Sequence, residues 1–158
     1  ATTEIYTLSL HDALPISDSL IDKNILIIGY GRIAKALHRL LAAYGSNITV
    51  CSRSAESAEL SSFYGASHIY FPELKKKNDF DIVINTVPHI VLTEAELKAL
   101  KKSVIILDLA SFPGGADTLM AASLGLKIIN GRGMPSKFTA KAAGEAIGCA
   151  ADEIIRQL

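Results

Sequence analysis

Short apolar runs alternate with amphipathic segments along the chain from about residue 18 onward. The apolar runs predict β-strands at 24–28, 47–51, 67–70, 81–84, 104–108 and 127–130. Helical spacing predicts helices at about 32–44, 55–64, 115–123 and 139–157, a brief helical turn at 72–77, and a capping-box helix start at Thr93–Glu96. Because strands and helices alternate, we expect an α/β fold: a Rossmann-type, doubly wound parallel sheet of about six strands with helices on both faces.

The turn after the first predicted strand has the pattern G-x-G-x-x-A, from Gly29 to Ala34. Gly29 permits a tight turn, Gly31 lets the backbone approach a pyrophosphate, and Ala34 keeps the following helix close to the strand. The free N–H groups of the helix N-terminus face the anion. A purely structural turn is the alternative, but the strand before and the helix after favour dinucleotide binding. The residues expected to contact the cofactor here are Gly29, Tyr30, Gly31, Arg32 and Ile33.

The segment after the second predicted strand favours NADP over NAD. NAD-binding sites usually place Asp or Glu there, whereas this chain has Ser52, Arg53 and Ser54, with no acidic residue before Glu56. The guanidinium of Arg53 can form charge-assisted hydrogen bonds with a 2′-phosphate, and the two serines can add hydroxyl donors. A surface arginine without a ligand is the alternative.

Polar residues also follow the fourth predicted strand. We expect the segment Asn85, Thr86, Val87 and Pro88 to border the nicotinamide side of the cofactor, since ligands bind at the carboxyl ends of parallel strands. An ordinary β-to-helix turn is the alternative. His89 comes next and is a candidate for the proton transfer that accompanies hydride transfer, although a lone histidine without a paired carboxylate is also typical of a bystander.

The loop after the fifth predicted strand is a candidate substrate site. Ser111 and the Gly114–Gly115 backbone can hold a substrate carboxylate, and Arg132 suits a dicarboxylate. Asp108 is a candidate catalytic acid or, equally, a structural acid with its hydrogen bonds satisfied.

Composition excludes several other classes. The 158 residues, 49% of them hydrophobic, fit one compact soluble domain, and 16 basic residues balance 16 acidic ones, so no nucleic-acid partner is expected. Cys51 and Cys149 are too few and too far apart for a disulfide framework or a metal site, which favours a cytoplasmic setting and no metal. No apolar run approaches the ~20 residues that span a bilayer. No Ser-His-Asp or Cys-His set indicates a hydrolase.

Residues 1–17 lie outside the alternating pattern. They lack the basic region of a signal peptide, and Glu4 and the His11–Asp12 pair interrupt their apolar positions. The string from Tyr6 to Ser17 resembles translated sequencing-adapter read-through, so we interpret 1–17 as a non-native leader of a fragment; a disordered or loosely docked leader is the alternative. Residues 18–158 are then the dinucleotide-binding domain.

Several linked strings resemble the C-terminal nucleotide-binding domain of the A subunits of dipicolinate synthase, a sporulation enzyme of endospore-forming bacteria. They are Gly29-x-Gly31-Arg32 with Ala34, Ser52-Arg53-Ser54, Ile84-Asn-Thr-Val-Pro88, Leu107-Asp-Leu-Ala-Ser-x-Pro-Gly-Gly-x-Asp117, and Gly133-Met-Pro135 followed by Lys141-x-Ala143-Gly144. The Asp-Leu-Ala-Ser-x-Pro-Gly-Gly string is the most distinctive. The chain departs from the family at Ser136, Ala140 and Ala142, where glycine, proline and threonine are usual.

The resemblance implies the cofactor domain of an NADP-dependent oxidoreductase that oxidises a dihydrodipicolinate-type precursor to dipicolinate. It also implies a dicarboxylate substrate, a partner in the form of a flavoprotein-like second subunit, and an N-terminal domain whose absence leaves the fragment with little turnover. The alternatives are the cofactor domain of another two-domain dehydrogenase, of the 2-hydroxyacid or shikimate type, and a non-catalytic dinucleotide-sensing module. The apolar face of the last predicted helix favours a homodimer.

Overall fold

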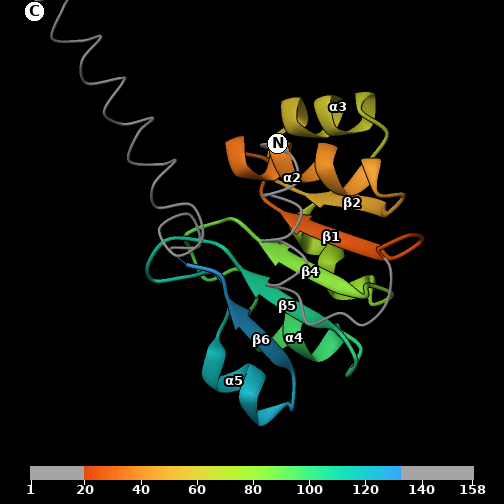
Figure 1. Cartoon of the computed structure of the whole chain (residues 1–158). Helices are drawn as coiled ribbons and strands as arrows, with labels where there is room; N and C mark the ends of the chain where they lie inside the picture. The colour runs from red at the N-terminus through yellow and green to blue at the C-terminus, as the bar shows by residue number, and fades with distance from the viewer. Residues whose placement is uncertain (1–19, 133–158) are drawn as a thin grey trace, which may run out of the picture. The chain divides into compact units, whose positions relative to one another are not determined.

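The computed structural model describes residues 20–132, of which 20–131 belong to one compact unit (Figure 1). This unit contains a six-stranded sheet with the strand order β3-β2-β1-β4-β5-β6. Every neighbouring pair of strands is parallel. The strands are β1 (Asn24–Ile28), β2 (Asn47–Cys51), β3 (Ser67–Ile69), β4 (Ile82–Asn85), β5 (Ile105–Asp108) and β6 (Lys127–Asn130). The order reverses between β1 and β4, which confirms the predicted doubly wound fold.

The connecting segments are four α-helices and one 3₁₀-helix within the described residues. They are α2 (Arg32–Ala43), α3 (Ala55–Phe63), η1 (Phe71–Lys76), α4 (Glu94–Ala99) and α5 (Thr118–Ser123). The predicted bounds agree within a few residues, and the largest difference is the start of α5. That helix begins at Thr118 rather than at 115, because the Asp117 side chain accepts a hydrogen bond from the Met120 N–H and so caps the helix there. The predicted helix at 139–157 lies outside the described residues.

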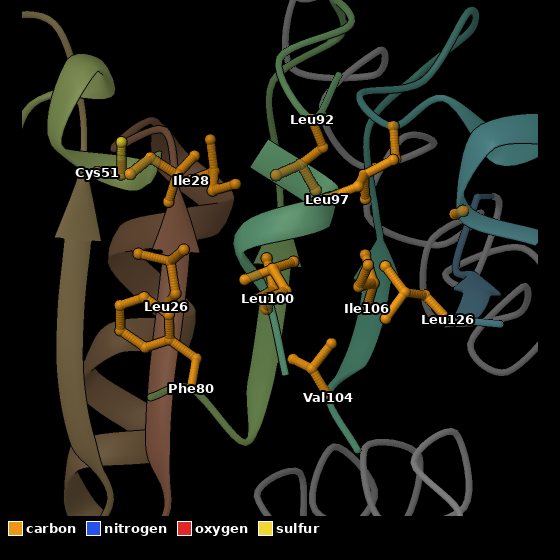
Figure 2. Close-up of a cluster of buried hydrophobic side chains, with 14 of the residues drawn as sticks. Leu26, Ile28, Cys51, Phe80, Leu92, Leu97, Leu100, Val104, Ile106 and Leu126 are labelled. Atoms are coloured by element: carbon orange, nitrogen blue, oxygen red, sulfur yellow. The ribbon is translucent and has the colours of Figure 1, made fainter. Parts of the chain in front are cut away.

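Helices cover both faces of the sheet because alternate strand residues point to opposite sides. On one face, Leu26 and Ile28 of β1 pack in a core cluster with Leu97 of α4 (Figure 2). η1 and α5 contribute to the same cluster through Leu74 and Ala121. On the other face lie Ile25 and Ile27, fully buried, and α2 packs on β1 and β2 with Ala34 and Leu41 buried.

The capping box predicted at Thr93 is present at the start of α4. The backbone N–H of Thr93 donates to the Glu96 carboxylate over 3.0 Å, and the Thr93 hydroxyl bonds the same carboxylate. Among the residues that the structure describes, no helix is long and apolar enough to cross a membrane.

Gly29 lies at a point of close approach, where the turn after β1 meets the loop after β4. Its φ of +89° lies in the region that disfavours other residues. A Cβ placed on it would lie 2.7 Å from the Thr86 hydroxyl oxygen and 2.8 Å from a Val87 methyl group. Thr86 cannot simply move away, because its hydroxyl donates to the Ile28 carbonyl over 2.8 Å. Position 29 therefore requires glycine, because its φ is positive and because a Cβ would collide with Thr86 and Val87.

We expect Gly29→Ala to lower the free energy of unfolding by roughly 3 kcal/mol, the sum of left-handed strain and overpacking. Gly65→Ala is the matched control, because Gly65 has a φ of +87° but open space around its missing Cβ. It should cost only about 1–2 kcal/mol. Urea unfolding of both variants measures the difference; equal losses would show that the close approach of Thr86 costs nothing.

Candidate dinucleotide-binding site

A cleft of about 850 Å³ opens at the carboxyl ends of β1, β2 and β4. Its lining includes every predicted cofactor residue except Asn85: Gly29, Tyr30, Gly31, Arg32, Ile33, Ser52, Arg53, Ser54, Thr86, Val87 and Pro88. The cleft has the size of ordinary cofactor sites and sits at the point where the strand order reverses. The structure thus brings the three predicted segments together, and their contacts with a cofactor stay predictions.

The glycine turn provides an anion site at the start of α2. Gly31 is the N-cap residue, no side chain caps the helix, and its first turn contains no acidic residue. Its first N–H groups are therefore open to a ligand, and the helix dipole favours an anion. A Cβ on Gly31 would meet nothing within 4 Å, so the missing side chain leaves space beside the turn. These residues fit the pyrophosphate of a dinucleotide.

The other end of the cleft is formed by the segment after β2. Arg53 is exposed, and within the described part of the chain no ion pair occupies its guanidinium. Ser54 caps α3, since its hydroxyl oxygen accepts the Ser57 N–H over 3.1 Å. Ser52 is buried, with 5% of its surface exposed, and its hydroxyl lies 2.9 Å from Nε2 of His68. Arg53 is therefore the available cation for a phosphate at this end.

Asn85 and Asp108 form a buried pair at the carboxyl ends of β4 and β5. The Asn85 amide donates to Oδ1 of Asp108 over 2.9 Å and to the Val87 carbonyl over 3.0 Å, and its oxygen accepts the Val87 N–H. Asp108 also accepts the N–H groups of Ala110 and Gly115. Their exposed fractions are 0% and 3%, and neither lines the cleft. The Asn85 amide thus orders the loop and does not line the cleft, and Asp108 has the geometry of the structural acid.

The other candidate catalytic residues lie apart from this pair. His89 is exposed and lines the cleft, next to Pro88. Ser111 is exposed in the loop after β5, where its carbonyl accepts the Gly114 N–H over 2.8 Å, and it does not line the cleft. The structure therefore does not join His89, Asp108 and Ser111 into one catalytic set. Within the described residues, no cluster of three or more His, Cys, Asp or Glu side chains could hold a metal ion.

Sequence reasoning missed three residues that line the cleft, namely Ser57, Phe71 and Val91. Ser57 lies in the first turn of α3, and the predicted cap at Ser54 could have indicated it. Phe71 and Val91 lie in connecting segments, and nothing in their spacing marks them. The thiol of Cys51, at the end of β2, is buried, which raises its pKa to about 12 and leaves it a poor nucleophile.

A second buried pair supports the glycine turn. The Tyr30 hydroxyl lies 2.8 Å from Nδ1 of His38 on α2, and His38 is only 1% exposed. Burial lowers the pKa of His38 below its ordinary value of 6.5, and the nearby Arg39 acts in the same direction. Burial also raises the pKa of Tyr30. The pair is therefore neutral near pH 7 and fixes the side chain between the two glycines.

The parallel sheet, its reversal between β1 and β4, and the glycine turn at that point define a Rossmann NAD(P)-binding domain. Residues 9–111 match the family described as D-isomer specific 2-hydroxyacid dehydrogenase, NAD binding domain, and the chain belongs to this family. Within it, the chain is an NAD(P)-binding domain like that of the A subunit of dipicolinate synthase.

Individual relatives support this assignment. The A subunit of dipicolinate synthase from Bacillus subtilis is 31% identical over 135 residues, which cover 85% of this chain and 46% of the relative. Its crystal structure matches with a TM-score of 0.90 at 27% identity, covering 98% of this chain and 52% of the other. A shikimate dehydrogenase (NADP(+)) of Methanococcus maripaludis is 34% identical over 137 residues, which cover 75% of this chain and 47% of the relative. The chain therefore spans about half the length of the relatives it matches, and it is homologous to NAD(P)-dependent dehydrogenases.

We expect Asp108→Asn to lower the free energy of unfolding by about 1–3 kcal/mol, because an amide N–H₂ would then face a backbone N–H that the carboxylate now accepts. Asp117→Asn makes the same chemical change at the N-cap of α5, where asparagine and aspartate cap equally well. Urea unfolding should show little change for this control. A fully stable Asp108→Asn protein would contradict the structural role of Asp108.

The lowered pKa of His38 predicts a pH dependence of stability. Above pH 6.5 the ring is neutral in both states and its contribution is complete. As the pH falls below 6.5, the unfolded chain binds a proton at this ring before the folded chain does, so the free energy of unfolding falls until the lower, folded-state pKa is reached. His38→Gln keeps a hydrogen-bonding group for Tyr30 but does not titrate.

Urea unfolding of both proteins between about pH 5 and pH 7 measures this effect, and the variant should show the shallower dependence. His68, whose pKa is also lowered by burial, contributes equally to both proteins, so the difference reports His38. Identical slopes would contradict the prediction.

Proposed function

We propose that this chain is the cofactor-binding half of an NADP-dependent oxidoreductase. The observation that carries the preference for NADP is the charge of the cleft lining: among the described residues it contains the cations Arg32 and Arg53 and no Asp or Glu. An NAD site usually offers a carboxylate to the ribose hydroxyls after the second strand, and that carboxylate would repel a 2′-phosphate. The similar shikimate dehydrogenase carries NADP(+) in its name, which agrees with this proposal.

The reaction that fits best is the oxidation of a dihydrodipicolinate-type precursor to dipicolinate, supported by the similarity to the A subunit of dipicolinate synthase. The bound cofactor supplies a nicotinamide ring that accepts or gives a hydride. The chain's own residues hold it: the α2 N-terminus binds the pyrophosphate, Arg53 the 2′-phosphate, and the segment Thr86–Pro88 borders the nicotinamide. His89 exchanges the proton that accompanies hydride transfer, since it is the titratable group nearest in sequence to this border and lines the same cleft.

The proposed substrate is a small dicarboxylate, and the proposed partner is a flavoprotein-like second synthase subunit. Both follow from the similarity to dipicolinate synthase. The second candidate is the cofactor domain of a shikimate-type dehydrogenase, which the 34% identity to the Methanococcus enzyme favours. The two candidates differ in substrate and agree on the cofactor, so cofactor binding is the first property to measure.

Isothermal titration calorimetry with NADP and with NAD tests the cofactor assignment. We expect NADP to bind more tightly, and Arg53→Ala to weaken NADP by about 10- to 100-fold with little effect on NAD, because only NADP carries the phosphate. Arg39→Ala removes the same charge from an exposed site on α2 that does not line the cleft. It should keep the preference for NADP. Equal affinities for both cofactors in the unchanged protein would overturn the proposal.

A further inference from the structure

His68 contacts the cleft through Ser52 but does not line it. β3 pairs with β2, which places His68 beside Val50, and the ring reaches the serine that follows β2. The distance from Nε2 to the Ser52 hydroxyl oxygen is 2.9 Å. The Ser52 N–H also donates to the Ile69 carbonyl, so its backbone is fixed to β3 as well. Ser52, which lines the cleft beside Arg53, is therefore held to β3 by two hydrogen bonds.

A serine hydroxyl has a single proton, and its neighbour decides where that proton points. If Nε2 of His68 carries a proton, the ring donates to Ser52, and the hydroxyl proton is free to point into the cleft. If Nε2 is unprotonated, Ser52 donates to the ring and presents only lone pairs to a ligand. A phosphate group needs donors, so only the first arrangement suits it. A ribose hydroxyl can donate or accept and suits either one.

Burial disfavours the His68 cation, so the form that can donate to Ser52 is the neutral ring with its proton on Nε2. Glu73 of η1 acts on His68 and favours its cation, whereas burial lowers the pKa of His68 below 6.5 and is the larger effect. The Tyr70 ring packs edge-on against the imidazole, with centroids 4.8 Å apart, and its backbone N–H holds the Glu73 carboxylate at 2.7 Å.

Other titratable groups lie on the elements beside β3. α3 packs on β3 and carries the exposed Glu56 and Glu59, and β2 ends in the thiol of Cys51, which stays neutral. Arg53 is the neighbouring cation on the cleft side. Glu73 is thus the charged group that acts on the ring, and a bound phosphate would add a second negative charge on the far side of Ser52.

We propose that His68 is a positioning residue for cofactor specificity: it directs the Ser52 hydroxyl into the cleft and thereby favours a dinucleotide that carries a 2′-phosphate. This inference rests on the proposed NADP binding. The Ser52–His68 pair at the β2–β3 edge is then a second determinant of the preference for NADP. It acts through a hydrogen bond, whereas Arg53 acts through its charge.

The first test determines by ¹⁵N NMR which ring nitrogen of His68 carries the proton, in the full chain alone and with each cofactor. The ring signal is assigned by its loss in His68→Gln. With NADP the ring should take up the tautomer that carries its proton on Nε2, since the phosphate favours the form that donates to Ser52, and NAD should leave the tautomer unchanged. A merely structural histidine would respond equally to both cofactors, and that result would overturn the inference.

The second test compares the ratio of NAD to NADP dissociation constants among variants. His68→Phe removes the donor and should lower the preference for NADP by about tenfold. His68→Gln restores a fixed N–H donor and should recover most of it. Ser52→Ala should lose as much as His68→Phe, and combining the two changes should cost nothing more, because both remove one hydrogen-bond chain. Ser67→Ala, an exposed residue next to His68 on β3, is the matched control.

The outcomes separate the two proposals. A protein without any preference for NADP overturns the proposed function and this inference together. A preference for NADP that persists in His68→Phe overturns the inference alone. If His68→Phe does not fold, the NMR result on the unchanged chain still decides.

Discussion

The cleft depends on one buried hydrogen bond, between the amide of Asn85 and the carboxylate of Asp108. Strands β4 and β5 end side by side with these two polar residues in register. Burying such groups is costly unless their hydrogen bonds are satisfied, and the backbone of the two following loops supplies the partners. Gly115 lies so close to the pair that a Cβ there would be 1.9 Å from the Asn85 nitrogen. The loop after β5 is thereby fixed to the loop after β4.

This constraint extends to the glycine turn. Just after Asn85, the backbone N–H and the hydroxyl of Thr86 both donate to the Ile28 carbonyl, at the end of β1. The wall of the cleft is therefore fixed on one side by β5 and on the other by β1. Because Thr86 approaches β1 so closely, only glycine fits at position 29. The close packing thus gives Gly29 a structural reason that is separate from the predicted binding of an anion by the G-x-G turn.

The sequence predicts the periodic features well and the side-chain pairs poorly. Apolar runs and glycine turns predict strands and the cofactor segments, because strand, turn and helix are local patterns. The polar partners are not local: Asn85 and Asp108 are 23 residues apart, and Ser52 and His68 are 16 apart. Each pair forms because two neighbouring strands align in a particular register. The spacing of residues along the sequence does not reveal that register. The position of Asn85 at the end of a strand therefore predicts that it faces the cofactor. In the structure, its amide instead forms hydrogen bonds with the backbone of Val87 in the following loop.

The two edges of the cleft have separate physical roles. At the β2–β3 edge, Arg53 is exposed and the Ser52 hydroxyl lies 2.9 Å from Nε2 of His68, so under the proposed function charge and hydrogen bonding there would act on the adenosine end of a cofactor. At the β4–β5 edge, the buried pair fixes the backbone while His89 remains exposed at the cleft. Changes at the first edge should alter which cofactor binds, and changes at the second should alter stability and the position of the nicotinamide. If the proposed function holds, mutation should therefore separate cofactor choice from chemistry within this one domain.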